Sequence, residues 1–184
     1  MQKPVVEVDN TIAAPPARVW EAMKAGAMFP GTTIHTDWKV GHPITFTGEW
    51  NGKAFVDRGE IQTISDEREL SFTHWSDKDR SGKRPASYHL VRYRLDGAGD
   101  GTRVTLSQFN EGDDQQVDDN TRAEFEKNWR MMLDGLKQVA EKGGRLRQQD
   151  PRGGGNLACD AVLRASASPC RSARDHTGSS DKSR

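Results

Sequence analysis

Residues 36–76 read TDWKVGHPITFTGEWNGKAFVDRGEIQTISDERELSFTHWS, and this stretch decides the fold. In its first half the apolar residues Ile44, Phe46 and Trp50 fall two or four residues apart, with polar residues between them. This period is typical of a strand with one buried face and one wet face. Asn51-Gly52 then supplies the residue pair that a two-residue hairpin turn requires, because both positions need positive φ. The stretch predicts four short strands joined by tight turns, which together form a curved, half-apolar wall.

The segments on either side of this wall predict two helices and three more strands. Residues 4–12 alternate as a strand, and Ala-Pro-Pro at 14–16 begins a helix. Two further alternating strands run over 87–96 and 102–109. The apolar residues of a helix from about Asp118 to Lys142 recur at spacings of three and four, and they are Phe125, Trp129, Met132, Leu133, Leu136, Val139 and Ala140. The order of strand, helix, six strands and helix predicts an α+β fold with an antiparallel sheet.

The composition divides the 184-residue chain into two parts. Residues 1–142 are the predicted domain, which is long enough to bury a core without metal or disulfides. Residues 143–184 are basic, rich in Gly, Ser and Arg, and contain no Phe, Tyr or Trp. Such a segment cannot bury enough apolar surface to offset its ordering entropy, so we expect a disordered tail. Two origins fit its abrupt onset, a native extension or a frame-shifted reading of the gene.

Charge and cysteine usage exclude several classes of function. The formal net charge is zero, which does not favour binding to nucleic acid or to an anionic membrane. No apolar run approaches the roughly 20 residues of a membrane span, and the first residues lack the apolar core of a signal peptide. We therefore expect a cytoplasmic protein. Cys159 and Cys170 lie in the tail without an accompanying His pattern, so we expect no metal site, and the sequence predicts no cofactor.

Several strings resemble those of one protein family. Residues 12–20 (IAAPPARVW) are similar to the opening of START-like (SRPBCC) ligand-binding proteins, the superfamily that includes the major birch-pollen allergen. Four later strings resemble the subgroup similar to the C-terminal domain of activators of the heat shock protein 90 ATPase: DWKVG (37–41), GEI (59–61), LSFTHW (70–75) and GTRVTL (101–106). The resemblance covers about residues 4–142. It implies the helix-grip fold, in which a curved antiparallel sheet wraps around a long C-terminal helix.

A curved sheet wrapped around a long helix predicts a ligand site between the sheet and the C-terminal helix. A mostly apolar pocket with a few polar groups is the usual form of a small-molecule site. Strand and helix periodicity places the following candidate ligand-binding residues on its lining: Phe46, Trp50, Phe72, His74, His89, Tyr93, Gln108, Trp129 and Leu133.

The polar candidates each have a plainer interpretation as well. His74 and His89 can act as acid, base or orienting donor near neutral pH, but core histidines satisfied by their neighbours are more common. Glu60 and Asp57, on either side of Gly59, could form an acid pair with Arg58 or Arg92 across strands, but a structural cross-strand salt bridge is the plainer expectation. The tryptophans at 38 and 75 flank the wall, and if exposed they would be anchors for a protein partner.

Three functions remain open at this stage. The first is a protein that binds or carries a small hydrophobic molecule, which needs only the cavity. The second is a chaperone-associated protein, as the resemblance to the heat shock protein 90 activators implies. The third is an enzyme similar to polyketide cyclases, with His74 or His89 as a general acid–base. We favour binding without catalysis, so we predict no catalytic residue.

Overall fold

The structure is a computed structural model that describes residues 3–50, 52–77, 83, 85, 87–112 and 117–142. The predicted tail at 143–184 lies outside these residues, so its disorder stays a prediction. The elements are, in chain order, β1 (Val6–Ile12), α1 (Pro16–Ala22), the π-helix η1 (Met23–Ala27), β2 (Thr32–His35), β3 (Pro43–Trp50), β4 (Lys53–Ser65), β5 (Glu69–Ser76), β6 (Ser87–Ala98), β7 (Gly101–Gly112) and α2 (Asp119–Lys142).

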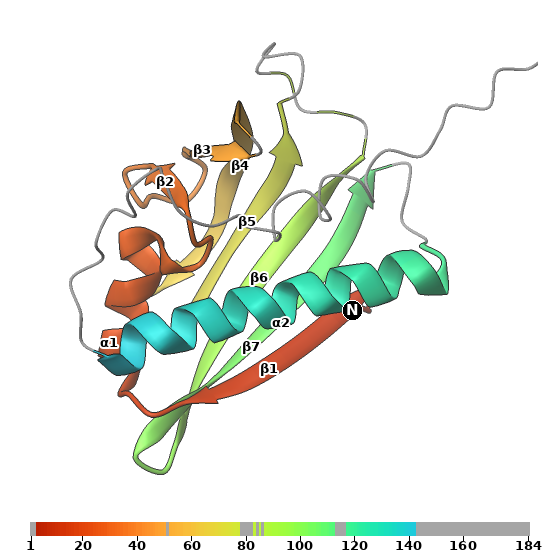
Figure 1. Cartoon of the computed structure of the whole chain (residues 1–184). Helices are drawn as coiled ribbons and strands as arrows, with labels where there is room; N and C mark the ends of the chain where they lie inside the picture. Colours follow the sequence, from red (N-terminus) through yellow and green to blue (C-terminus); the bar gives the residue numbers. More distant parts are fainter. Residues whose placement is uncertain are drawn as a thin grey trace, which may run out of the picture.

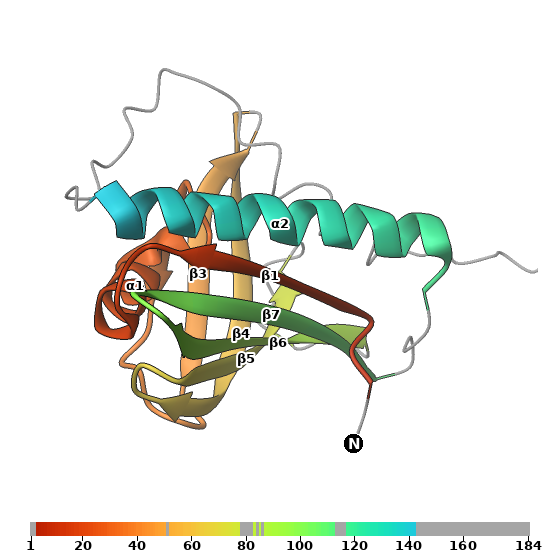
Figure 2. The same cartoon turned by 90° about the horizontal axis from the view of Figure 1, so that it is seen from below.

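The strands form one seven-stranded antiparallel sheet with the order β1-β7-β6-β5-β4-β3-β2. The sheet is curved, and α2 lies across one of its faces, with α1 and η1 beside the C-terminal part of α2 (Figures 1 and 2). The predicted apolar stripe of α2 faces this sheet, and all its members are buried except Val139, which is partly buried. The predicted α+β helix-grip architecture is therefore confirmed.

The wall differs from the prediction in its number of strands. Residues 36–76 contain three strands, because β2 ends at His35, before the stretch begins. The prediction of four short strands was wrong since β4 runs for 13 residues without a break. The polar residues in the middle of β4 alternate with apolar ones and continue the strand. The chain bends there through a register shift between Ile61 and Thr63 and makes no turn. The hairpin is confirmed, because Trp50 pairs with Lys53 and Gly52 has φ 72°.

Gly59 lets β4 lie unusually close to β5 at this bend. A Cβ atom at position 59 would lie 1.8 Å from the backbone oxygen of Thr73. On the next residue, the Glu60 backbone N–H donates a 2.9 Å hydrogen bond to Thr73 Oγ1. Only a residue without a side chain fits at 59, so the close approach of the two strands depends on this glycine.

The helix α2 is held at both ends. Asp118 caps its start, since the Thr121 backbone N–H donates to Asp118 Oδ1 at 2.7 Å. The last turns are held by the chain around β1 and α1: Lys137 Nζ donates to the Thr11 carbonyl at 2.7 Å, the Ala13 N–H donates to Glu141 Oε1 at 2.8 Å, and Arg18 Nε donates to the Ala140 carbonyl. None of the helices in the described part of the chain is long and apolar enough to cross a membrane.

Candidate functional site

The predicted ligand-binding residues converge on the space between the sheet and α2. Those with described side chains are all buried, and they are Phe46, Phe72, His74, His89, Tyr93, Gln108, Trp129 and Leu133. Trp50 is the last residue of β3, next to the hairpin turn, and its side chain lies outside the description. The alternation of the strands therefore placed the described candidates on the correct face of the sheet.

Aromatic rings form the apolar part of this interior. The rings of Phe46 and Phe72 lie 5.5 Å apart between centroids, and those of Phe72 and Tyr93 lie 6.4 Å apart. Phe29, from the turn after η1, adds a ring 4.7 Å from Phe46 and 6.0 Å from Trp129. Phe29 was not among the predicted lining residues, because it lies between η1 and β2 and belongs to no alternating strand. The apolar run Ala27-Met28-Phe29 before the proline was the available signal.

One group of polar side chains in the interior is hydrogen-bonded throughout. This amide network consists of His89, Gln108, Asn110 and Trp129. The indole N–H of Trp129 donates to Gln108 Oε1 at 2.6 Å, and Gln108 Nε2 donates to Asn110 Oδ1 at 2.9 Å. Because an indole nitrogen only donates, Trp129 fixes which end of the Gln108 amide faces it. The network therefore has one consistent orientation of its amides.

His89 sits at the side of this network. Its Nδ1 lies 3.0 Å from Asn110 Oδ1 and 3.1 Å from Gln108 Nε2, and its ring meets Phe125 edge-on at 5.4 Å. Burial lowers the pKa of His89 to about 4, and the nearby His74 adds to this effect. His89 is therefore a neutral ring at pH 7, held in place by amides and an aromatic side chain.

A second polar pair in the same interior lacks such partners. This carboxylate–imidazole pair consists of Asp57 on β4 and His74 on β5, with Asp57 Oδ2 at 3.3 Å from His74 Nε2. Both residues are buried, with 4% and 2% of their surface exposed. The ring is not aligned to donate to the carboxylate. Asp57 Oδ1 and both ring nitrogens of His74 thus have no hydrogen-bond partner among the described residues.

The expected cross-strand salt bridge of Asp57 and Glu60 with Arg58 or Arg92 is not formed, and Glu60 accepts a hydrogen bond from Gln62 instead. The carboxylate of Asp57 points to the inner face of the sheet, where it meets His74. Arg58, the next residue along β4, faces the other way and pairs with Asp77, while Arg92 lies near Glu69. The prediction was wrong because adjacent residues of a strand point to opposite faces of the sheet. The side chains of Asp57 and Arg58 therefore cannot pair with each other.

Three more groups of the core are unsatisfied within the described residues. They are the Tyr93 hydroxyl and Asn128 Nδ2, which lie between the sheet and α2, and Trp20 Nε1 on α1. Burial raises the pKa of Tyr93 above its usual value, so this hydroxyl keeps its proton at neutral pH. Asn128 was missed by the sequence analysis, since it stands beside the apolar stripe of α2 and not on it. A buried polar group without a partner costs about 1–3 kcal/mol, so each such group calls for an explanation.

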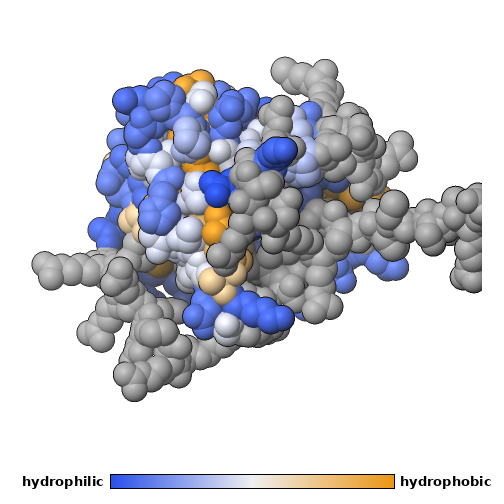
Figure 3. Space-filling model, turned by 90° about the horizontal axis from the view of Figure 1, so that it is seen from above, coloured by the Kyte–Doolittle hydropathy of each residue, from blue (hydrophilic) through white to orange (hydrophobic). Residues whose placement is uncertain are grey.

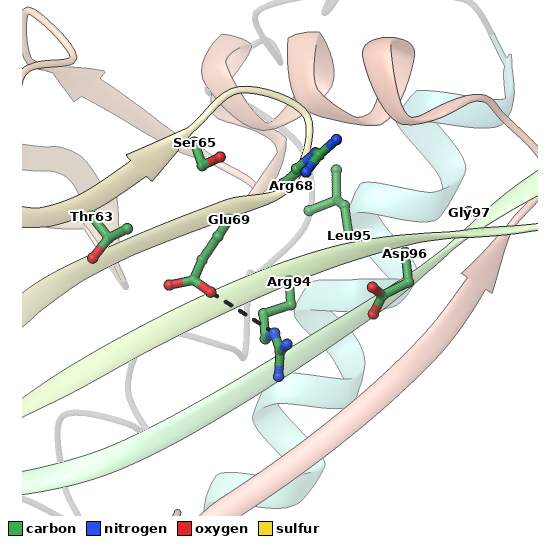
Figure 4. A pocket seen from close by; sticks show the side chains of 8 residues that line it. All are labelled: Thr63, Ser65, Arg68, Glu69, Arg94, Leu95, Asp96 and Gly97. Carbon is green, nitrogen blue, oxygen red and sulfur yellow. Dashed lines mark ion pairs between the residues drawn. The ribbon is translucent and has the colours of Figure 1, made fainter. Parts of the chain in front are cut away.

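One surface pocket lined by described residues lies outside this interior. It has a volume of about 540 Å³ and is lined by Thr63, Ser65, Arg68, Glu69, Arg94, Leu95, Asp96 and Gly97. Figure 4 shows these side chains on the β4–β5 hairpin and on β6, with Arg94 beside Glu69. Acidic and basic groups balance here, and no predicted site residue lines the pocket.

The tryptophans proposed as partner anchors are not freely exposed. Trp38 is half-buried and packs against the core, and Trp75 is half-buried with an indole nitrogen shielded from solvent. The exposed large hydrophobic residues of the described chain are Val40 and Met131. The view in Figure 3 accordingly shows a mostly hydrophilic surface with small, separate apolar areas. Because Trp38 and Trp75 are only partly exposed, the condition for anchors of a protein partner is met only in part.

A curved antiparallel sheet closed by a long helix around a largely apolar interior defines a START-like (SRPBCC) protein of the helix-grip fold. The sequence profile described as "Activator of Hsp90 ATPase homolog 1-like protein" matches residues 13–141. The chain belongs to this family. No curated protein sequence matches it.

Solved structures agree with this assignment. The solution structure of ChR145 from Cytophaga hutchinsonii is 32% identical, with a TM-score of 0.58 over 77% of this chain and 98% of that chain. The Aha1 dimer from Colwellia psychrerythraea is 16% identical, with a TM-score of 0.56 over 76% and 98% of the two chains. Ara h 8.0201 is 15% identical, with a TM-score of 0.57 over 73% and 95%. The last two show the fold alone.

Proposed function

We propose that this chain is a cytoplasmic protein that binds a small hydrophobic molecule between the sheet and α2. The observation that carries the proposal is the set of unsatisfied polar groups in a largely apolar, aromatic interior. These groups are the Tyr93 hydroxyl, Asn128 Nδ2, the His74 ring and Asp57 Oδ1. A bound molecule with a few polar atoms would supply the missing partners and would bury its apolar surface against the rings.

The surface gives less support to a chaperone-associated role. Such a role needs an apolar contact area, and in the described part of the chain the exposed large hydrophobic residues are Val40 and Met131. The family name carries the word activator, but no observation on this chain singles out a contact area for a chaperone. We therefore place ligand binding first and chaperone association second.

Thermal unfolding in the presence of a library of small hydrophobic molecules tests the proposal. A ligand that binds only the folded state at 100 times its Kd stabilises it by about 2.7 kcal/mol. We expect some library members to raise the Tm, and native mass spectrometry to show one such molecule per chain. A library without any stabilising member would contradict the proposal.

A substitution then locates the site. Tyr93→Phe removes only the buried hydroxyl, so a ligand that uses this group should bind more weakly to the variant than to the wild type. Tyr88→Phe makes the same change on the other face of β6, and we expect unchanged binding. Equal affinities of all three proteins for every ligand would place the molecule outside the interior.

A further inference from the structure

The carboxylate–imidazole pair has the composition of a proton-transfer site. We propose that Asp57 and His74 form an acid–base pair that moves a proton on a carbon acid bound in the interior, that is, on a molecule whose C–H bond is made acidic by a neighbouring carbonyl. This inference rests on the proposed ligand site. It goes further by giving two of its residues a chemical role.

The geometry of the pair divides this role between the two residues. His74 Nε2 faces Asp57 Oδ2 at 3.3 Å, which leaves His74 Nδ1 as the nitrogen directed away from the carboxylate. Nδ1 is buried and has no hydrogen-bond partner in the described chain. Catalytic hydrogen bonds are often long or poorly aligned before substrate binds, so the present misalignment fits a pair that tightens around a ligand.

The proposed step balances without any further reactant. The C–H bond breaks, its proton moves to the lone pair of His74 Nδ1, and its electron pair forms the enolate of the bound molecule. The Asp57 carboxylate then lies beside the imidazolium and stabilises its charge. Return of the proton to another carbon completes an isomerisation. Asp57 is thus a positioning residue, and His74 is the residue that contacts the reacting atoms.

His89, the neighbouring histidine, does not share this role. His89 lies directly opposite His74 in the β5–β6 ladder, but its Nδ1 is occupied by the amide network. No carboxylate lies within ion-pair distance of the His89 ring among the described residues. Two neighbouring histidines in one interior therefore differ in what their nitrogens can do.

The aromatic rings around His74 suit a flat substrate. Phe29 stacks on the His74 ring, with centroids 5.6 Å apart and planes 14° apart, and Phe46 meets it edge-on at 5.5 Å. A planar carbon acid can lie against these rings with its acidic C–H toward Nδ1. In such an apolar surrounding a base is poorly solvated, and its electrostatic interactions are stronger than in water.

A planar carbon acid with a coloured product tests the inference on the full chain. In 5-nitrobenzisoxazole a base removes the ring C–H proton, the C–H electrons form a nitrile, and the N–O bond breaks to release a nitrophenolate that absorbs visible light. We expect the wild type to accelerate this reaction. General-base catalysis contributes about 100- to 10,000-fold, so His74→Gln should lose about 100-fold or more in rate.

Further variants separate chemistry from folding. Imidazole added to His74→Ala should restore part of the rate, since the free base enters the vacated space. Asp57→Asn should be slow and Asp57→Glu should recover part of the activity, which a purely structural role of the carboxylate would not predict. His35→Gln changes an exposed histidine on β2 and should retain the full rate.

Binding of unreactive 6-nitrobenzotriazole, followed by thermal shift, distinguishes the two proposals. Binding together with equal rates for the wild type and His74→Gln would overturn the acid–base pair and leave the ligand site standing. An absence of both binding and rate enhancement would overturn the acid–base pair. The hydrophobic library then decides separately on the ligand site. Binding with a rate that depends on His74 and recovers with imidazole supports both.

Discussion

The two histidines that face each other across β5 and β6 stand in opposite situations. His89 belongs to an amide network in which each polar side chain has hydrogen-bond partners. His74 and its partner Asp57 are equally buried, yet three of their polar atoms have no partner among the described residues. Satisfied buried networks make a core specific and rigid, whereas each unsatisfied buried group calls for an explanation. The proposed ligand site would supply that explanation for one of the two histidines and not for the other.

The largest expected effect comes from a substitution that separates β4 from β5 and with them Asp57 from His74. Gly59→Ala places a Cβ 1.8 Å from the Thr73 carbonyl oxygen, so the strands must move apart and Asp57 leaves His74. We expect a loss of about 4 kcal/mol in the free energy of unfolding, measured with urea. Gly97→Ala is the matched control, because a Cβ there meets nothing within 4 Å. A loss no larger than that of the control would contradict the tight approach.

Removal of the centre of the amide network should come next in size. Gln108→Leu leaves the Trp129 indole N–H without its present partner, which costs about 1–3 kcal/mol, while the Asn110 carbonyl keeps His89 Nδ1. Because Trp129 is fully buried, we expect a loss of about 3 kcal/mol in chemical denaturation. Gln62→Leu, on the exposed part of β4, should change stability by less than about 0.5 kcal/mol. Similar effects of the two variants would show that the network does not stabilise the core.

The pH dependence of stability sharpens the comparison for His89. The pKa of His89 is about 4 in the folded protein and about 6.5 in an unfolded chain, so the unfolded state binds the proton first as the pH falls. The contribution of the neutral His89 ring to the free energy of unfolding is therefore fully present above pH 6.5. It decreases by between about 2 and 3 kcal/mol as the pH falls from 6.5 to 4. His89→Gln should remove this part of the slope, whereas His35→Gln should keep it. An unchanged slope in His89→Gln would refute the neutral, buried ring.

The smallest expected effect has the opposite sign. Tyr93→Phe deletes a hydroxyl that has no partner within the described chain, so the empty protein should become more stable by about 1 kcal/mol. The wild type is the reference. Thermal unfolding of ligand-free protein measures the difference. Destabilisation of Tyr93→Phe relative to the wild type would mean that the hydroxyl is already satisfied in the empty protein.

Periodicity predicted the fold and the inner face of the site, because both depend on local alternation. The residues at 44 and 46 of β3, at 70, 72 and 74 of β5, and at 89, 91 and 93 of β6 are buried as their spacing requires. Contacts between distant strands could not be predicted in this way. The Asp57–His74 pair depends on the register and the bend of β4 beside β5, and Phe29 reaches the interior only through the geometry of its turn. Neither feature has a periodic signal.

The ties between β1 and the last turns of α2 have a consequence for synthesis on the ribosome. β1 pairs with β7 about a hundred residues later, as in Val6 with Gln108, and Thr11 accepts a hydrogen bond from Lys137. An emerging chain therefore holds an unpaired, half-apolar first strand until most of the domain has left the exit tunnel. Such late closure of distant contacts slows folding and prolongs exposure to other nascent chains. The stretch from residue 4 to residue 12 is where a holding chaperone would be needed longest.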